Sequence, residues 1–174
     1  MKRLILVWLL VTLGPWLRAS ESVTPNAESS RARDLESEVA ALISGPQITV
    51  VHFWAPWCPN CKAELTPDGW AKFVRGNPAV KIVFINIWHE GQDGTAKLKL
   101  AGLGAQPNFV AFMHPNPARK SGERLEGFLG LPISWIPTTW VFKDGKLRYA
   151  LNYGEMRFTM LQQMVRDSAE SWDR

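Results

Sequence analysis

The sequence predicts an α/β fold in which a central mixed β-sheet is flanked by helices on both faces. Two observations lead to this fold class. Segments of strand length alternate with segments of helical apolar spacing, and the last helix follows an antiparallel hairpin. That hairpin is predicted by Asp144-Gly145, the strongest two-residue turn signal. With 174 residues, 46% of them hydrophobic, the chain can form one domain with its own core.

The first 19 residues have the composition of an export signal. A basic head, Lys2-Arg3, precedes an apolar run over residues 4–13, which is shorter than the ~20 residues that a transmembrane helix needs. We expect residues 1–19 to be a signal peptide or, as the alternative, an N-terminal membrane anchor that tethers the protein through residues 4–17. In both cases the domain is expected in the periplasm or another extracytoplasmic compartment.

The rest of the chain divides into a linker and one domain. Residues 20–33 are rich in Ser, Glu, Arg and Ala without apolar periodicity, which indicates a solvated linker. The domain is expected over residues 34–174. It begins with a helix that Asp34 caps and that Gly45-Pro46 ends, and a buried strand follows over residues 48–54.

Later elements follow from the same patterns. Residues 59–75 are amphipathic and predict one helix with a kink at Pro67. Residues 80–88 are almost continuously apolar, which predicts a central strand buried on both faces. The remaining elements are a helix over 95–103, a strand over 108–113, a surface loop over 114–120, a helix over 123–129, strands over 138–143 and 146–151, and a closing helix over 155–172. His89 and His114, near predicted loops, are expected on the surface.

The basic charge of the chain does not indicate nucleic-acid binding. Residues 1–19 carry three of the 20 basic residues and none of the 16 acidic ones, so the remainder holds 17 basic against 16 acidic residues. No basic run remains there that could follow a phosphate backbone. We therefore expect no nucleic-acid partner.

Cys58 and Cys61 are the residues that carry chemistry. They are the two cysteines of the chain, and they stand where the first strand ends and a helix begins. The unpaired N–H groups and the positive dipole end of a helix N-terminus stabilise a thiolate, which lowers the pKa of the first cysteine. The second cysteine, one turn later, can attack a mixed disulfide from within, so the pair can exchange two electrons.

A structural disulfide and half of a zinc site are the alternatives for this pair. A loop this short removes little entropy from the unfolded chain, and the sequence has no second cysteine pair or His-x3-His spacing to complete a zinc shell. We expect no metal site and no cofactor besides the redox-active Cys58-Cys61 disulfide.

Two motifs resemble the thioredoxin superfamily. Residues 52–62, HFWAPWCPNCK, are similar to its active-site stretch, and residues 135–146, WIPTTWVFKDGK, are similar to its cis-proline loop and last hairpin; Tyr153-Gly154 also matches. The similarity covers roughly residues 45–170 and is strongest to the exported TlpA/ResA/DsbE-like branch of thiol-disulfide proteins. The resemblance implies a thioredoxin fold.

The resemblance also implies roles for individual residues. Cys58 would be the attacking thiol and Cys61 the buried resolving thiol. Ile136-Pro137 would form a cis peptide beside the sulfurs, which costs only about 0.5–1 kcal/mol before proline, and Ile136 would offer its backbone to an extended substrate. The remaining candidates for substrate contact or for the apolar rim are Trp57, Pro59 and Trp54, with a plain core position as the alternative for Trp54.

Two positions near the cysteines depart from the family pattern. His52 stands where thioredoxin has a buried acid, so a neutral imidazole could accept a proton from Cys61; a hydrogen-bonded core histidine is the alternative. Glu64 matches an acid that the branch carries three residues after the second cysteine, but Pro67 follows one residue late. We interpret Glu64 as a solvated helix residue, and we keep modulation of the cysteines as a candidate role for His52, Glu64 and Trp54.

The predicted function is that of an exported thiol-disulfide oxidoreductase acting on protein thiols and disulfides. The resemblance favours a reductase, recharged by a membrane electron donor of thiol-disulfide type, in cytochrome c maturation or periplasmic thiol reduction. Family potentials of roughly −270 to −120 mV leave a disulfide-donating oxidase or isomerase as an alternative. Two further alternatives are a copper-binding protein that uses Cys58, Cys61 and a histidine, and a redox-inactive binding module.

Overall fold

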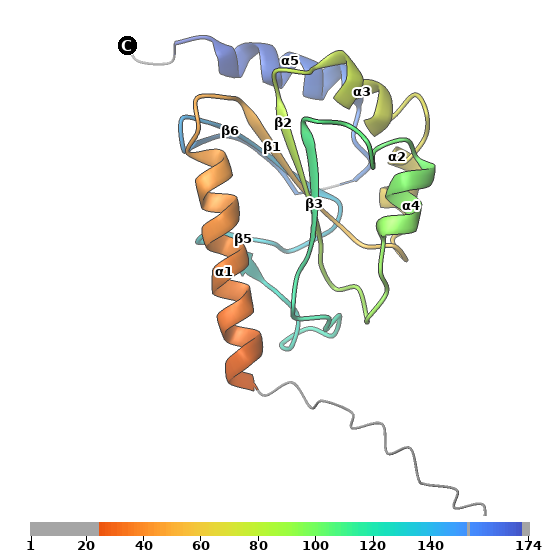
Figure 1. Ribbon diagram of the computed structural model, residues 1–174, viewed down its shortest axis with the longest axis vertical. Helices are drawn as coiled ribbons and strands as arrows, with labels where there is room; N and C mark the ends of the chain where they lie inside the picture. Colours follow the sequence, from red (N-terminus) through yellow and green to blue (C-terminus); the bar gives the residue numbers. More distant parts are fainter. Residues whose placement is uncertain (1–24, 153, 172–174) are drawn as a thin grey trace, which may run out of the picture.

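Five strands form one mixed sheet at the centre of the molecule (Figure 1). The computed structural model describes residues 25–152 and 154–171. The strands, in the order in which they lie side by side, are β3 (Phe109–Met113), β2 (Lys81–Asn86), β1 (Thr49–Trp54), β6 (Thr138–Lys143) and β7 (Lys146–Leu151). β1, β2 and β3 run parallel, whereas β6 is antiparallel to β1 and β7 to β6. This arrangement confirms the predicted mixed sheet.

The central position of β1 fixes where the cysteines lie. β1 pairs with β2 on one side and with β6 on the other, and all six of its residues are buried. Its side chains alternate between the two faces of the sheet. The His52 ring lies 4.6 Å from the Phe84 ring on one face, and the Phe53 ring lies 4.6 Å from the Trp140 ring on the other. The chain leaves β1 directly into the turn that holds Cys58.

Helices cover both faces of the sheet, as predicted. The helices are α1 (Pro25–Ile43), α2 (Pro59–Glu64), α3 (Trp70–Gly76), α4 (Thr95–Leu100) and α5 (Phe158–Ala169). Figure 1 shows α1 on one side of the sheet and α2 and α4 on the other. The two parallel crossovers, β1 to β2 and β2 to β3, place their helices on the same face because such connections are right-handed. α5 packs on α3 and on β6.

The first helix begins earlier than predicted. α1 starts at Pro25, so residues 25–33 of the predicted linker are helical and Asp34 lies inside the helix instead of capping it. The segment lacks an apolar stripe, but its Ala, Glu and Arg residues are good helix formers, and proline suits the first helical turn. Helix propensity therefore extends the element beyond the part that Leu35 and Val39 anchor in the core.

The predicted single helix over residues 59–75 is instead two helices. α2 ends at Glu64 and α3 begins at Trp70, so Pro67 marks a complete interruption and not a kink. Proline has no N–H to donate, and it disfavours helical geometry in the residue before it. Gly69 then allows a close approach, because a Cβ there would lie 2.1 Å from the Glu64 carbonyl oxygen.

The predicted helix over residues 123–129 is wrong. The chain there forms a small hairpin from β4 (Gly127–Phe128) and β5 (Leu131–Pro132). Leu129 and Gly130 both have positive φ, as a two-residue hairpin turn requires. Phe128 is fully buried against Phe53, and this tertiary contact outweighs the weak helical pattern.

His89 and His114 are buried, which corrects their predicted surface positions. Their exposed fractions are 2% and 3%. The ring of His89 has Nε2 at 2.9 Å from the His114 carbonyl oxygen and accepts the Gly91 N–H at Nδ1. His114 accepts the Asn116 N–H at Nδ1. Both rings thus satisfy backbone groups of two neighbouring loops, a role that the sequence pattern does not reveal.

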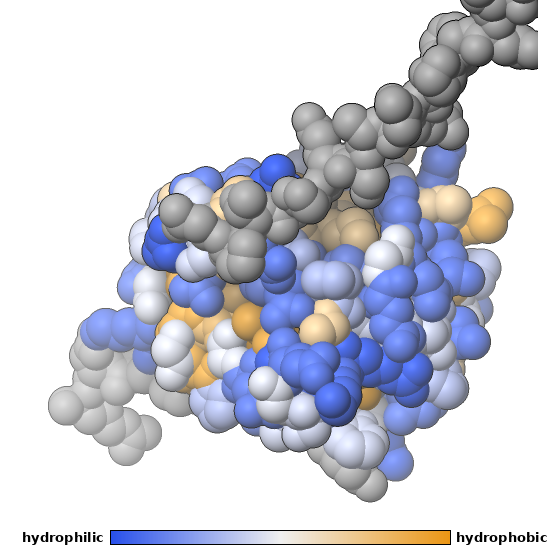
Figure 2. Space-filling view, turned by 90° about the horizontal axis from the view of Figure 1, so that it is seen from below, coloured by the Kyte–Doolittle hydropathy of each residue, from blue (hydrophilic) through white to orange (hydrophobic). Residues whose placement is uncertain are grey.

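Apolar side chains are concentrated inside the molecule. In Figure 2 the visible face is covered mainly by hydrophilic residues, with apolar residues in the gaps between them. Within the residues that the structure describes, none of the helices combines the length and apolarity that crossing a membrane requires. The predicted signal or anchor over residues 1–19 lies outside those residues.

The packing of α5 on the sheet predicts a large effect for Leu161→Ala. Leu161 is fully buried, so its truncation leaves a cavity and should lower the free energy of unfolding by about 2–5 kcal/mol in urea denaturation. The neighbouring Met160 is 41% exposed, and Met160→Ala should change the same quantity by less than about 0.5 kcal/mol. Equal effects of the two substitutions would contradict this placement of α5.

Candidate active site

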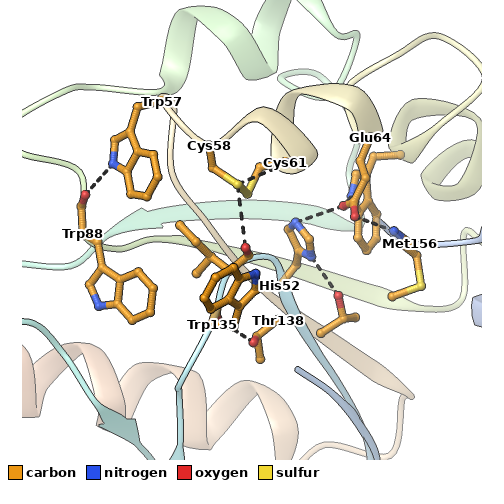
Figure 3. Close-up of a disulfide and its surroundings, with 12 residues drawn as sticks. His52, Trp57, Cys58, Cys61, Glu64, Trp88, Trp135, Thr138 and Met156 are labelled. Atoms are coloured by element: carbon orange, nitrogen blue, oxygen red, sulfur yellow. Dashed lines mark hydrogen bonds and ion pairs between the residues drawn. A yellow bond between two sulfur atoms is a disulfide. The ribbon is translucent and has the colours of Figure 1, made fainter. Parts of the chain in front are cut away.

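Cys58 and Cys61 are joined by a disulfide at the start of α2 (Figure 3). Cys58 is the N-cap residue, and Pro59 occupies the first turn, where its missing N–H leaves no bond unmade. The Cys61 N–H points at Cys58 Sγ from 3.3 Å, so a thiolate at Cys58 would accept this hydrogen bond. Cys58 is 3% exposed and Cys61 1% exposed. Of the two sulfurs, Cys58 is the one placed for attack on a partner.

The proline loop lies against the disulfide, as the resemblance implied. The Ile136–Pro137 peptide is cis, and the Ile136 carbonyl oxygen lies 3.8 Å from Cys58 Sγ. Both residues are buried, and the Thr138 hydroxyl donates to the Trp135 carbonyl oxygen at 2.8 Å across the turn. The loop therefore brings a backbone carbonyl, fixed in position, next to the sulfur of Cys58.

Three of the predicted residues line one cavity beside Cys58. Its volume is about 350 Å³, and Trp57, Pro59 and Ile136 contribute to its wall. Pro59 is exposed and Trp57 half-buried. The Trp57 indole N–H donates to the Trp88 carbonyl oxygen at 2.6 Å, which fixes the ring at the rim. Trp57, Pro59 and Ile136 therefore surround the reactive sulfur.

Trp54 lies away from that cavity, in the core. It is 1% exposed, and its ring packs so closely on Gly94 that a Cβ there would lie 2.5 Å from the indole. No hydrogen-bond partner for its buried indole N–H is found among the described residues. This placement favours the core interpretation of Trp54 over a position on the apolar rim.

His52 and Glu64 form a buried pair close to the disulfide. His52 Nε2 lies 3.4 Å from Glu64 Oε2, and each side chain is 1% exposed. The other ring nitrogen, Nδ1, is 2.9 Å from the Thr139 hydroxyl oxygen. Figure 3 shows His52 between the disulfide and Glu64. The pair can therefore hold or pass a proton at a site that solvent does not reach.

Two N–H groups hold the Glu64 carboxyl group. The Trp70 indole donates to Oε2 at 2.9 Å, and the Met156 backbone donates to Oε1 at 2.6 Å. The prediction of a solvated Glu64 is thus wrong. α2 ends at Glu64, and Trp70 of α3 and the backbone before α5 cover its carboxyl group. The spacing of three between Cys61 and Glu64, which places both on one helix face, was the available signal.

Burial shifts the pKa values of both groups in opposite directions. Loss of hydration raises the pKa of Glu64 from 4.5 to about 7, although the hydrogen bonds from Trp70 and Met156 lower it and the charge of Glu155 raises it further. Burial lowers the pKa of His52 from 6.5 to about 3. We conclude that His52 is neutral at pH 7, so its contact with Glu64 is not an ion pair.

Two arginines of the site carry no signal in the sequence that would identify them. Arg119 and Arg124, from the segment between β3 and β4, line the same cavity as Cys58. The guanidinium carbon of Arg119 lies 3.7 Å from the centre of the Trp57 ring, and that of Arg124 lies 4.3 Å from the centre of the Trp88 ring. Their position depends on how the segment folds back over the sheet, which local sequence pattern does not predict.

Metal ligands do not gather around the disulfide. Among residues 25–152 and 154–171, no group of three or more His, Cys, Asp or Glu side chains lies in positions that could hold a metal ion. The alternative of a copper site formed by Cys58, Cys61 and a histidine therefore finds no such group of ligands among these residues.

Comparisons with known proteins agree with this geometry. The family described as thioredoxin-like domain matches residues 36–169. The sequence is similar to sporulation thiol-disulfide oxidoreductase A of Bacillus subtilis (strain 168), with 28% identity over 142 residues that cover 80% of this chain and 74% of that protein.

Two solved structures are similar in fold. One is a putative thioredoxin from Neisseria meningitidis, with a TM-score of 0.51 and 20% identity over 76% of this chain and 81% of that chain. The other is a thiol:disulfide interchange protein from Chlorobium tepidum TLS, with a TM-score of 0.51 and 18% identity over 75% of this chain and 85% of that chain. Together with the family match, they confirm the predicted thioredoxin fold.

The raised pKa of Glu64 gives a pH-dependent stability that can be measured. The folded state keeps a proton that the unfolded chain releases, so the contribution of Glu64 to the free energy of unfolding is complete below pH 4.5 and is lost as the pH rises through about 7. Glu64→Gln removes this loss. The free energy of unfolding of the variant minus that of the wild type should therefore increase with pH, by up to about 1.4 kcal/mol per pH unit.

Urea denaturation of the oxidised proteins from pH 4.5 to 7.5 measures this difference without titrating cysteines. Glu123→Gln is the matched control, because it makes the same substitution at a carboxyl group that is 59% exposed. A constant difference for Glu64→Gln would show that Glu64 has the same pKa in both states.

Proposed function

We propose that this protein reduces disulfides in exported proteins. The premise is that the chain belongs to the thioredoxin-like family and is a thiol-disulfide oxidoreductase of that family. One observation carries the proposal. The Cys58–Cys61 disulfide is buried except where Cys58 lines an open cavity beside the Ile136 carbonyl. An extended protein segment lying in this cavity would bring its own sulfur to Cys58 while Cys61 stays shielded.

The reaction starts from the reduced pair. The Cys58 thiolate attacks one sulfur of the substrate disulfide. A bond forms between Cys58 Sγ and the attacked sulfur, the substrate disulfide bond breaks, and the leaving thiolate takes up a proton. Cys61 then loses its proton, and its thiolate attacks Cys58 Sγ. The mixed disulfide breaks, the second substrate thiol leaves, and the Cys58–Cys61 disulfide forms. The second substrate sulfur also leaves as a thiolate and takes up a proton. The protein thus supplies two electrons and the proton of Cys61, and solvent supplies the other proton, which Cys58 released when its thiolate formed.

We propose that His52 receives the proton of Cys61 in the second step. Its position between the disulfide and Glu64 supports this. Burial keeps the imidazole neutral but makes it a weak base, with a pKa of about 3, so the proton passes on to the carboxylate of Glu64, the more basic member of the pair. The Glu64 carboxyl group, held by Trp70 and Met156, fixes the ring from the other side. Glu64 is thus a positioning residue, and it can share the proton because its pKa is raised to about 7.

The direction and the compartment rest on the sequence. The export-like residues 1–19 support work outside the cytoplasm, as a soluble domain or tethered through residues 4–17. The resemblance to the TlpA/ResA/DsbE-like branch supports reduction of protein disulfides, with a membrane thiol-disulfide donor restoring the Cys58 and Cys61 thiols. No cofactor beyond the cysteine pair enters this scheme.

The function is tested by turnover and by the reduction potential. The wild type should reduce insulin disulfides in the presence of a dithiol donor, and Cys58→Ser should abolish this activity, whereas Cys61→Ser should accumulate a mixed disulfide visible by mass spectrometry. Equilibration with glutathione should give a potential of about −270 to −220 mV. A value near −120 mV would instead establish an oxidase, and a pair that does not cycle would remove the oxidoreductase assignment.

The role of His52 predicts a selective kinetic effect. His52→Asn should slow the breakdown of the mixed disulfide about tenfold at pH 7 but leave the attack by Cys58 within about twofold, as measured by stopped-flow with a chromogenic disulfide. Glu64→Gln should shift the pH profile of the same step. A structural role alone would predict that both steps change together, and this result would overturn the assignment.

A further inference from the structure

We propose that Arg119 and Arg124 make the site select substrate segments that carry carboxylate side chains next to the reacting cysteine. This inference rests on the proposed function and specifies its substrate class: an extended, acidic segment of an exported protein. The two arginines come from the segment between β3 and β4, which lies outside the strand, helix and proline loop that hold the sulfurs.

The charge of the cavity wall is one-sided. Arg119 and Arg124 line the cavity of about 350 Å³ that opens on Cys58, and none of the acidic residues in the described part of the chain lines it. The rest of the wall is largely aromatic, with Trp57, Trp88 and Trp135. Trp135 is 55% exposed although it is large and apolar. A segment that combines a carboxylate with apolar atoms would complement both the charge and the apolar surface of this wall.

Stacking on tryptophan holds each guanidinium in place. Arg119 lies over Trp57 and Arg124 lies over Trp88, at 3.7 and 4.3 Å from the ring centres. Trp57 in turn donates to the Trp88 carbonyl oxygen, and the Trp88 indole donates to the Leu125 carbonyl oxygen at 2.8 Å. A stacked guanidinium keeps its N–H groups free at its edges, where they can bind a carboxylate with two parallel hydrogen bonds.

The neighbouring acidic residues leave N–H donors of both arginines available for a ligand. Arg119 Nη1 lies 3.4 Å from Glu90 Oε2, and both side chains are 50% exposed. Arg124 Nε lies 3.6 Å from Glu126 Oε1, which is too long for a hydrogen bond. This buried nitrogen has no hydrogen-bond partner among the described residues. A guanidinium has five N–H donors, so one long contact does not saturate it.

The segment that carries the arginines is fixed to the rest of the molecule. The Glu90 N–H donates to the Pro117 carbonyl oxygen at 2.9 Å, and His89 Nε2 contacts the His114 carbonyl oxygen at 2.9 Å. The Ile133 N–H donates to the Glu126 carbonyl oxygen at 3.0 Å. Arg119 and Arg124 are therefore presented on a backbone that is already ordered, which lowers the entropic cost of binding a substrate.

Two synthetic peptides test this selection. Each contains one cysteine activated as a mixed disulfide with the uncharged 2-thiopyridyl group, flanked on both sides by Asp in one peptide and by Asn in the other. Cys58 attacks the peptide sulfur, the peptide–thiopyridyl bond breaks, and release of pyridine-2-thione reports the rate. For the reduced full-length chain we expect the Asp peptide to react about fivefold faster at low salt, with the ratio falling towards one in 1 M salt.

Three variants separate this inference from its rivals. Arg119→Gln/Arg124→Gln should bring the ratio of the two rates to about one, because both peptides then meet a cavity wall without its two positive charges. Arg119→Lys/Arg124→Lys, which keeps the charge but loses the stacked fork, should retain only part of the ratio. Lys120→Gln is the control for net charge, because it removes one positive charge from the same segment at a side chain that is 79% exposed and does not line the cavity.

The possible failures are distinguishable. A wild-type ratio of one, or a ratio that survives in Arg119→Gln/Arg124→Gln, overturns the inference. An equal loss in Lys120→Gln overturns it too, because net charge and not the cavity wall would then govern the rate. If the wild type reacts with neither peptide, the proposed oxidoreductase function itself fails.

Discussion

The buried carboxyl group of Glu64 joins four separate parts of the chain beside the cysteines. It ends α2, accepts the indole N–H of Trp70 from α3, accepts the backbone N–H of Met156 ahead of α5, and faces His52 on β1. An ionised carboxylate in such a place needs these donors, since an unpaired buried charge is costly. The positions of α2, α3 and α5 relative to one another therefore depend on this one group. The environment of the resolving cysteine, Cys61, depends on it too.

Much of the frame could be predicted from the sequence because it follows local rules. Continuous apolar runs at β1 and β2, the Asp144-Gly145 turn and the cysteine pair between a strand and a helix each identify their element without knowledge of the fold. The structure agrees at each of these places. Apolar periodicity does not predict the other places correctly. Helix propensity sets the start of α1, proline interrupts the helix at Pro67, and a tertiary contact determines the structure of residues 123–129.

Some residues of the site could likewise be identified from the sequence, and others could not. Cys58, Cys61 and the Ile136–Pro137 peptide belong to two contiguous motifs and could be identified from the sequence. The burial of Glu64 could not, because it depends on how α3 and the segment before α5 close over a short helix. The same holds for Arg119 and Arg124, which reach the cavity only through the path of a long segment whose anchors, His89 and His114, look like surface residues in the sequence.

Because the helix is interrupted after Glu64, the backbone N–H groups and the helix dipole that act on the sulfurs belong to α2 alone. α2 has six residues, so its dipole is small, and a thiolate at Cys58 relies on the local N–H of Cys61. α3 begins a new hydrogen-bond ladder at Trp70, and its buried Trp70 and Phe73 stabilise the fold. A substitution on the exposed side of α3 can consequently change the surface charge without altering the backbone N–H groups that face Cys58.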